Sequence, residues 1–212
     1  MKLSLAMGAA ALCLASGAAL ANTSQCDSNP ADQVVNCGFE TGDFTGWTLG
    51  GSSAALLQTN LYGIDAYNPY SGSYDAFFGT QGATLGTHLS TDSITLTQMM
   101  DLEIGRAYTI SFELDQDTPL STGYTNYFNA SINGTSLLTL SGVGVTGGYV
   151  QESFTYTATT SALSPLVFAS QNDAGTWFLD DIVISQVPEP ASMAMFGVGL
   201  LALAGLSRRR RA

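Results

Sequence analysis

The chain has 212 residues, with 6 Lys and Arg against 17 Asp and Glu and a formal net charge of −11. Five of the six bases are Lys2 and the four arginines at 208–211, so between the two ends Arg106 alone faces all 17 acids, a net charge near −16. A surface of this kind cannot neutralise phosphates, which excludes ordinary nucleic-acid binding, and it excludes electrostatic docking of the core on anionic lipid. It is compatible with high solubility and with divalent cations.

The first 21 residues have the layout of a secretory signal peptide. Lys2 is followed by an apolar run over residues 3–20 that closes with Ala19-Leu20-Ala21. A charged start, a short apolar run and a small-x-small exit predict cleavage after Ala21. The alternative is an N-terminal membrane anchor, which the shortness of the run disfavours.

Two cysteines remain after this cleavage, Cys26 and Cys37. An even pair in an exported protein predicts a disulfide, which would close a small loop and add about 2–3 kcal/mol of stability. A structural zinc site needs four nitrogen or sulfur ligands, and His88 is the only histidine that could join these two.

Residues 22–186 are predicted to form a single all-β domain. In residues 107–115, apolar side chains alternate with polar ones in the period of two expected of a half-buried strand. Asn133-Gly134 separates two similar runs and predicts a tight hairpin, because both residues tolerate positive φ. No convincing amphipathic helix is found, and we expect a two-sheet β-sandwich or jelly roll. Further strands are predicted within residues 93–98, 128–132, 137–140, 150–156, 166–168 and 177–185.

The opening segment, residues 34–47, contains Asn36-Cys37-Gly38-Phe39-Glu40 and ends at Gly46-Trp47, and the closing strand reads Phe178-Leu179-Asp180-Asp181-Ile182-Val183. Both resemble the corresponding segments of carbohydrate-binding-module-like jelly rolls, although Cys37 stands where that pattern has glycine. The resemblance implies a structural calcium ion held by Glu40 and Asp180. Calcium takes six to eight oxygen ligands, so carboxylates suit it. Asp181 would point to the opposite face of a regular strand. The alternative is that Glu40 and Asp180 bond backbone amides. Trp47 and Trp177 are predicted to lie in the core.

Aromatic side chains are the candidates for ligand binding, because sugar rings stack on aromatic faces and tyrosine adds a polar tip. A first group lies in a Gly-, Asn- and Ser-rich stretch beside Asp65, Asn68 and Gln81, and a second comprises Tyr124 and Tyr127. The alternative is that these rings pack over the rim of the sandwich. The predicted carbohydrate-binding residues are Tyr62, Tyr67, Tyr70 and Tyr74.

Catalytic constellations are scarce. Glu113 and Asp115 lie two residues apart on one strand face, and a retaining glycosidase needs two carboxyl groups about 5–5.5 Å apart. A polar outward strand face explains the same pair without chemistry. His88 has no Gly-x-Ser-x-Gly nucleophile motif to serve, and no phosphate-binding loop or dinucleotide fingerprint is present.

The chain ends with Pro188-Glu189-Pro190, an apolar run over residues 193–206 and an arginine cluster, which would stay in the cytoplasm by the positive-inside rule. Residues 187–212 closely resemble the PEP-CTERM sorting signal of Gram-negative bacteria. The resemblance implies transient anchoring in the inner membrane by a C-terminal transmembrane helix and cleavage by an exosortase near Pro188-Glu189-Pro190. It also implies release to the cell surface or extracellular matrix, in a setting of exopolysaccharide production. The alternative is a plain C-terminal anchor.

We therefore expect an exported, non-catalytic β-sandwich protein associated with the cell surface or with the exopolysaccharide matrix of a biofilm. A lectin-like module with a defined glycan ligand is the first alternative, and a glycoside-acting enzyme is the second. No nucleic-acid partner is expected, and the membrane is involved only through the C-terminal helix before cleavage.

Overall fold

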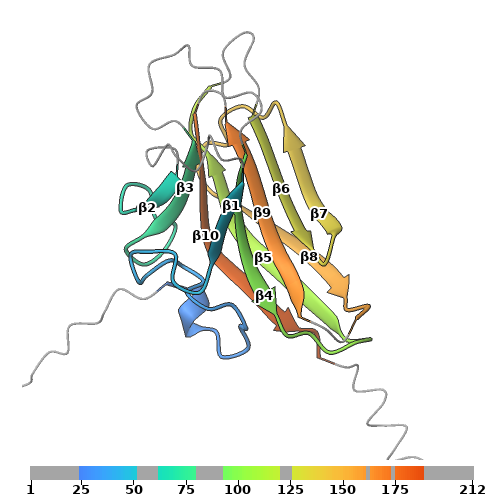
Figure 1. The fold of residues 1–212 in the computed structure, drawn as a ribbon. Helices are drawn as coiled ribbons and strands as arrows, with labels where there is room; N and C mark the ends of the chain where they lie inside the picture. Colours follow the sequence, from blue (N-terminus) through green and yellow to red (C-terminus); the bar gives the residue numbers. More distant parts are fainter. Residues whose placement is uncertain are drawn as a thin grey trace, which may run out of the picture.

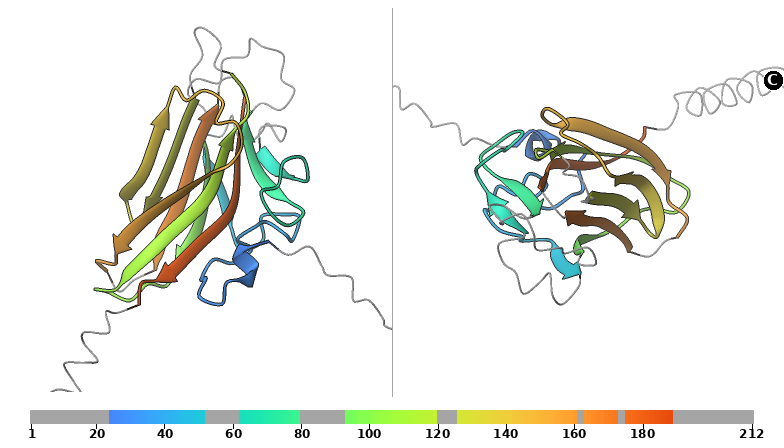
Figure 2. Two further views of the ribbon diagram at one scale, coloured as in Figure 1. Left: turned by 180° about the vertical axis from the view of Figure 1, so that it is seen from behind. Right: turned by 90° about the horizontal axis from the view of Figure 1, so that it is seen from above.

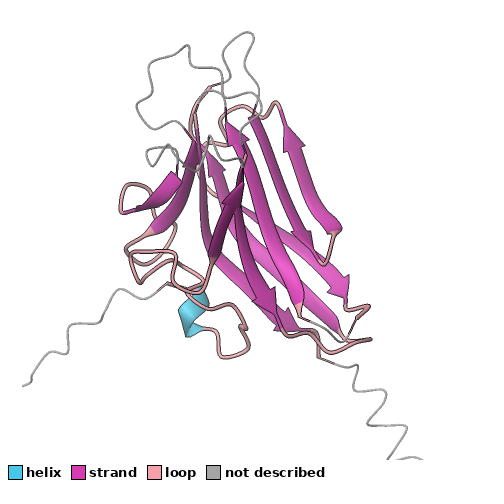
Figure 3. Ribbon diagram, in the orientation of Figure 1, coloured by secondary structure: helices cyan, strands magenta, loops and turns pink. Residues whose placement is uncertain are grey.

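The computed structural model describes residues 24–51, 62–79, 93–119, 126–160, 163–172 and 175–188. The expected signal peptide, Gln81, His88, Tyr124 and the sorting signal beyond Pro188 lie outside this described part. Within it the chain forms ten strands and one short 3-10 helix, η1 (Cys26–Ser28), as Figure 3 shows. No helix among the described residues has the length and apolarity of a membrane span.

The strands form two antiparallel sheets that pack face to face (Figures 1 and 2), which confirms the predicted all-β sandwich. The first sheet has the order β1-β4-β9-β6-β7, and the second has the order β2-β3-β10-β5-β8. The strand bounds are β1 (Thr48–Gly51), β2 (Tyr62–Asp65), β3 (Asp75–Gly79), β4 (Ile94–Met100), β5 (Ala107–Gln116), β6 (Asn126–Ile132), β7 (Thr135–Ser141), β8 (Val150–Thr157), β9 (Ser164–Asn172) and β10 (Thr176–Gln186).

The predicted alternation places one face of each central strand in the core. On β5, Tyr108, Ile110 and Phe112 are at most 1% exposed and point between the sheets. The Asn133-Gly134 turn joins β6 to β7 with φ values of 47° and 75°, the left-handed conformation that a two-residue hairpin turn requires.

Aromatic rings fill the space between the sheets. The ring centroids of Phe112 and Phe168 are 5.1 Å apart in an edge-to-face contact, and those of Phe128 and Trp177 are 5.3 Å apart. Trp47 packs on Phe168 at 6.1 Å. Both tryptophans lie in the core as predicted, since Trp177 is 0% and Trp47 is 7% exposed. Rings in such offset and edge-to-face arrangements stabilise the fold by more than the burial of their surface area alone.

The start of the described chain is bound to the last strand rather than loosely ordered. The Gln33 N–H donates to the Ile184 carbonyl at 3.1 Å, and the Ile182 N–H donates to the Cys37 carbonyl at 3.1 Å. Cys26 and Cys37 form the predicted disulfide, with their Cα atoms 6.1 Å apart. Residues 24–37 therefore form a cover along β10.

Candidate functional site

The segment that joins β2 to β3, residues 66–74, carries most of the predicted ligand-binding tyrosines, and we call it the tyrosine loop. It lies over the outward face of the second sheet. The Tyr67 ring stacks on Phe178 of β10, with centroids 6.2 Å apart and planes inclined by 26°. The Asn68 side-chain amide donates to Asp115 of β5 at 2.9 Å. Phe178 and Asp115 are paired across neighbouring strands, so the loop covers the middle of the sheet.

Carboxylates bind the backbone of the tyrosine loop at its second half. Glu40 accepts the N–H groups of Ser73 and Tyr74 at 2.9–3.1 Å. Asp180 accepts those of Tyr70 and Ser71 at 2.9 and 3.2 Å. These contacts join the opening motif and the last strand to one loop. They are the backbone hydrogen bonds expected of Glu40 and Asp180 as the alternative to calcium ligation.

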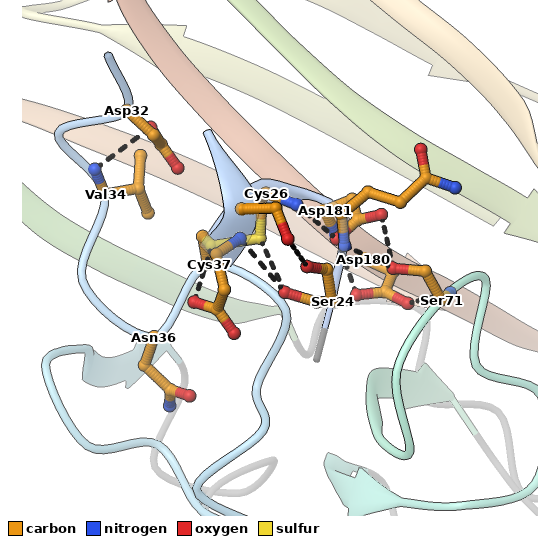
Figure 4. Close-up of a disulfide and its surroundings, with 12 residues drawn as sticks. Ser24, Cys26, Asp32, Val34, Asn36, Cys37, Ser71, Asp180 and Asp181 are labelled. Carbon is orange, nitrogen blue, oxygen red and sulfur yellow. Dashed lines mark hydrogen bonds between the residues drawn. A yellow bond between two sulfur atoms is a disulfide. The ribbon is translucent and has the colours of Figure 1, made fainter. Parts of the chain in front are cut away.

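Asp181 joins the same cluster, contrary to the expectation for a regular strand. The pairing of β10 with β5 shifts register between Asp180 and Val183, and Asp181 adopts φ 44°. This bulge turns the Asp181 carboxylate toward the loop, where it accepts the Ser71 hydroxyl at 2.6 Å, and toward the Cys26 N–H at 3.2 Å (Figure 4). Bulges re-aim side chains in this way because the extra residue breaks the alternation.

Two more carboxylates lie beneath the first half of the loop. Asp65 accepts the Tyr67 N–H at 2.9 Å. Asp75 stands opposite Asp65 in the β2–β3 register and accepts the Tyr149 hydroxyl at 2.9 Å. The Tyr149 ring in turn meets the Tyr70 ring edge-on, with centroids 5.5 Å apart. Tyr149 lies just before β8, far from the other tyrosines in sequence, and no local pattern identified it.

Burial raises the pKa values of two acids in this cluster, Asp180 and Asp75. Loss of hydration raises the pKa of Asp180 to about 8, and the neighbouring Asp181 charge adds to the effect. Loss of hydration also raises the pKa of Asp75 to about 7, with a further contribution from Asp65. Burial is therefore the main cause of the raised pKa at both positions. These two carboxyl groups are stabilised when they bind a proton or lie beside a cation.

These acids offer oxygen atoms, the donor type that a hard cation takes, but no three carboxylates of the described residues have ligand atoms within 4.8 Å of one another. Asp180 is fully buried and Asp181 is 6% exposed, and Arg106, the only base among the described residues, pairs with Glu103 at 3.4 Å. Buried carboxylates that lack a cationic side chain are suited to calcium, which prefers oxygen ligands. A cation at Glu40 and Asp180 would complete its shell with carbonyl or water oxygens.

A second group of potential ligands lies beside the disulfide. Among the described residues, the only three Cys, His, Asp or Glu ligand atoms within 4.8 Å of one another belong to Cys26, Asp32 and Cys37. Both cysteines are oxidised to the disulfide, so they offer no thiolate. This group is therefore not a metal centre in the oxidised protein.

The predicted tyrosines divide into two kinds. Tyr67, Tyr70 and Tyr74 are 77%, 41% and 36% exposed and lie on the tyrosine loop. Tyr62 is the first residue of β2, is half-buried and packs against Phe44 with ring centroids 6.4 Å apart. Three tyrosines therefore form the exposed aromatic surface, and Tyr62 supports the core beneath it.

Glu113 and Asp115 are buried rather than open to solvent, at 3% and 5% exposed. Glu113 accepts the Gln151 side-chain amide at 2.9 Å, which joins β5 to β8. Asp115 accepts the Asn68 amide and the Thr146 hydroxyl, which joins β5 to two loops. Their hydrogen bonds are those of structural polar residues, and the acid pair considered for glycoside hydrolysis has a packing role.

The outward face of the first sheet can be compared with the tyrosine loop, which covers the second sheet. Tyr127 and Asn129 of β6 are half-exposed there, and their register partners on β9 are Gln171 and Ala169. Tyr127 is the one aromatic residue on the described part of this face.

A protein-family model described as the PEP-CTERM protein-sorting motif matches residues 186–211. No curated protein sequence matches the chain. The family match begins at the end of β10, where the described sandwich stops. The motif implies an exported protein that an exosortase processes and that is sorted to the cell surface.

The core is similar in fold to a solved carbohydrate-binding module. TmCBM61 in complex with β-1,4-galactotriose aligns with a TM-score of 0.52 and 18% identity, over 74% of this chain and 99% of that chain. The bacteriophage CBA120 tailspike protein 4 enzymatically active domain aligns at 0.49 and 13%, over 74% of this chain and 22% of that one. The Clostridium thermocellum xylanase 10B CBM22-1–GH10 modules complexed with xylohexaose align at 0.49 and 16%, over 74% and 29%. The chain thus carries a PEP-CTERM sorting motif directly after a core with the fold of a carbohydrate-binding module.

Proposed function

We propose that this protein is a non-catalytic polysaccharide-binding component of the bacterial cell surface or exopolysaccharide matrix. It would reach the inner membrane of a Gram-negative cell through its N-terminal signal peptide. An exosortase would then cleave the chain near Pro188 and release the sandwich. The sorting motif at 186–211 supports the route, and the sandwich fold supports the binding activity.

The observation that carries the binding proposal is the exposure of two rings on the tyrosine loop, those of Tyr67 and Tyr70. One face of Tyr67 stacks on Phe178, while 77% of the side chain stays accessible. A sugar ring can stack on a flat aromatic surface of this kind through its C–H groups. The structural relative TmCBM61 was solved with a galactose trisaccharide, which makes neutral β-linked polymers the natural first probes.

The order of the tyrosine loop before a ligand binds also supports the binding proposal. The backbone of the tyrosine loop is bound by Asp65, Asp180 and Glu40 at 2.9–3.2 Å. A loop that is already ordered loses little conformational entropy on binding, so the rings can contribute more of their contact energy to affinity.

The binding test uses the purified protein against galactan, xylan and β-glucan in affinity electrophoresis, followed by calorimetry with the best ligand. We expect saturable binding that weakens at least about fivefold in Tyr67→Ala and in Tyr70→Ala, because truncation of a ring that carries binding energy costs more than about 1 kcal/mol. Tyr127→Ala is the matched control on the opposite sheet and should bind as the wild type does. Loss of binding in Tyr127→Ala alone would place the site on the first sheet instead.

The non-catalytic part of the proposal has its own test. Oligosaccharides of the bound polymer are incubated with the protein, and their length is followed by mass spectrometry. We expect no change in length. Turnover that disappears in Glu113→Gln would assign the protein to glycoside hydrolysis.

We also propose that calcium binds at Glu40 and Asp180 and supports the tyrosine loop. The buried Asp180 and Asp181 carboxylates, without a basic side chain nearby in the described part, favour this. Calcium at millimolar concentration should raise the melting temperature by several degrees, and EDTA should reverse the increase. Asp180→Asn should melt at the same temperature with and without calcium. Melting of the wild type that does not respond to calcium or EDTA would contradict the proposal.

A further inference from the structure

Two carboxyl groups lie beside the disulfide of the cover along β10. One carboxylate oxygen of Asp32 and the sulfur atoms of Cys26 and Cys37 all lie within 4.8 Å of one another, and Figure 4 shows the three residues in one region. The Asp27 Oδ1 atom lies 3.3 Å from the Cys37 Sγ atom. Two sulfur atoms and two carboxyl groups are therefore brought together within residues 26–37, apart from the carboxylates that bind the tyrosine loop.

Asp32 has an oxygen atom that the fold does not use. Its Oδ1 atom accepts the N–H groups of Val34 and Ile184 at 3.1 and 2.8 Å, and these two bonds fix the carboxyl group in place. Its Oδ2 atom is buried and has no hydrogen-bond partner. Buried acceptors are normally paired, so an unpaired oxygen on a fixed carboxyl group close to two sulfur atoms is suited to binding a cation.

The contact between Asp27 and Cys37 is better satisfied in the reduced protein. A disulfide sulfur carries no hydrogen, so Cys37 has none to donate to the Asp27 Oδ1 atom 3.3 Å away. Both atoms are electron-rich. Once the bridge is reduced, a thiol proton or a metal ion can lie between them and bind both.

This set of donor atoms is that of a zinc-type metal ion. Zinc takes four ligands in a tetrahedron, with cysteine sulfur at about 2.3 Å and carboxylate oxygen at about 2.0–2.2 Å. The ligand atoms of such a shell are about 3.3–3.8 Å apart. The separations of at most 4.8 Å found here reach this range by small side-chain rotations. Calcium and magnesium prefer oxygen ligands alone, so the sulfur atoms disfavour them.

Burial suits a structural metal site that is closed to solvent. The Cys26 and Cys37 side chains are 2% and 1% exposed. Loss of hydration raises the pKa of Asp32 to about 6, so this carboxyl group is ionised at pH 7.5 and can act as a ligand there.

We propose that the reduced form of this protein binds one thiophilic divalent metal ion, represented by zinc, through Cys26, Cys37 and Asp32. Asp27 completes the shell. The metal ion and the disulfide are then two alternative ways to close the cover along β10. The cytoplasm keeps thiols reduced, so a newly exported chain can bind metal before the bridge forms. Metal binding releases the two thiol protons, whereas disulfide formation needs an oxidant that takes up two electrons, with release of the same two protons.

The test compares the reduced and oxidised forms of the purified protein at pH 7.5. The reduced form is prepared with a phosphine reductant in denaturant and refolded without oxygen. We expect native mass spectrometry to find one zinc ion on each reduced chain and none at this site on the oxidised chain. Cobalt(II), which can replace zinc at such sites, should give the reduced form a thiolate-to-cobalt charge-transfer band and the visible bands of a tetrahedral ion. The oxidised form is the control, because it keeps every carboxylate.

Variants assign the ligands. Asp32→Asn keeps an acceptor oxygen for the Val34 and Ile184 N–H groups but loses the charge. It should weaken zinc binding by the reduced form at least about tenfold, since even residues that only support a ligand cost about 10–100-fold. Asp101→Asn is the matched control, since Asp101 is exposed and outside this group, and it should keep the wild-type affinity. Melting curves confirm that each variant is folded.

A measurement on the wild type needs no substitution. Zinc should slow the alkylation of Cys26 and Cys37 by iodoacetamide in the reduced form, and EDTA should restore the rate. Equal zinc binding by the two redox forms would place the metal at carboxylates elsewhere and overturn the inference. A cobalt complex without the thiolate band, or an Asp32→Asn protein with wild-type affinity, would also overturn it. The polysaccharide tests use the oxidised protein, so their outcome is separate.

Discussion

Single residues decide which groups meet at the tyrosine loop. Asp181 has φ 44° in a β-bulge, a conformation uncommon outside glycine, and this places its carboxylate beside Ser71. Tyr149 connects the buried Asp75 to the exposed Tyr70 through one hydrogen bond and one ring contact. Both residues contact partners that are far away in the sequence, and both therefore help to build the site.

Asp75 makes stability depend on pH. Its pKa of about 7 in the folded protein lies above the 3.8 of a free side chain, so the folded state retains a proton that the unfolded state releases. This contribution is complete below about pH 4 and is lost as pH rises toward 7. Asp32, with a pKa of about 6, acts in the same direction. We expect the free energy of unfolding to be lower at pH 8 than at pH 5.

The variant Asp75→Asn separates the hydrogen bond of residue 75 to Tyr149 from the titration of its carboxyl group. The amide oxygen can still accept the Tyr149 hydroxyl, but the group no longer titrates. The variant should gain stability relative to the wild type at pH 8, by up to a few kcal/mol at about 1.4 kcal/mol per pKa unit. Urea unfolding at pH 5 and pH 8 measures the change, with the exposed Asp101→Asn as the charge-matched control. An Asp75→Asn protein with the pH slope of the wild type would refute this explanation.

At the scale of elements, the pairing of β3 with β10 requires a close backbone approach. Gly79 lies opposite Thr176 at the end of that pairing, and a Cβ atom at Gly79 would lie 2.8 Å from the Thr176 Cα and closer still to the Gly175 carbonyl oxygen. The strands therefore meet at a distance that only glycine permits, and this helps to position β3 and the tyrosine loop before it.

Gly79→Ala should lower the free energy of unfolding by about 2–3 kcal/mol, because backbone atoms must move to admit the methyl group. Gly144→Ala is the control: Gly144 has no atom within 4 Å of the added Cβ, and its change should stay within about 0.5 kcal/mol. Equilibrium denaturation in guanidinium chloride measures both variants. Equal stability of the two would show that the β3–β10 contact can relax without cost.

At the scale of the whole molecule, the disulfide closes a loop within the cover along β10, residues 24–37. Cys26 and Cys37 are buried at 2% and 1% exposed and are 11 residues apart in sequence. The Cys37 carbonyl accepts the Ile182 N–H, so the bridge supports the strand that carries Asp180 and Asp181. The two ends of the described chain are thus held together.

The double variant Cys26→Ser, Cys37→Ser should lose about 2–3 kcal/mol of unfolding free energy, since a short cross-link restricts the unfolded chain by about this amount. Guanidinium unfolding with and without reductant measures it. The wild type in reductant should approach the variant, and the variant should not respond to reductant. Identical midpoints for the oxidised wild type and the variant would show that the bridge adds no stability.

The amino-acid sequence by itself determined the fold class, the strand alternation in β5, the hairpin at Asn133-Gly134 and the C-terminal sorting motif. These features are local: period-two patterning, turn chemistry and terminal composition can be recognised over a few residues. The disulfide followed from the compartment and an even cysteine count.

Only the tertiary structure decided which outward-facing side chains are covered. Glu113 and Asp115 follow the same alternation as exposed polar residues, and both are buried. Asn68 of the tyrosine loop bonds Asp115, and Gln151 of the neighbouring β8 bonds Glu113. The bulge at Asp181 and the contact of Tyr149 with Asp75 depend on strand order and register across the second sheet. Pairing between strands far apart in sequence sets these positions, and no local pattern encodes which strands become neighbours.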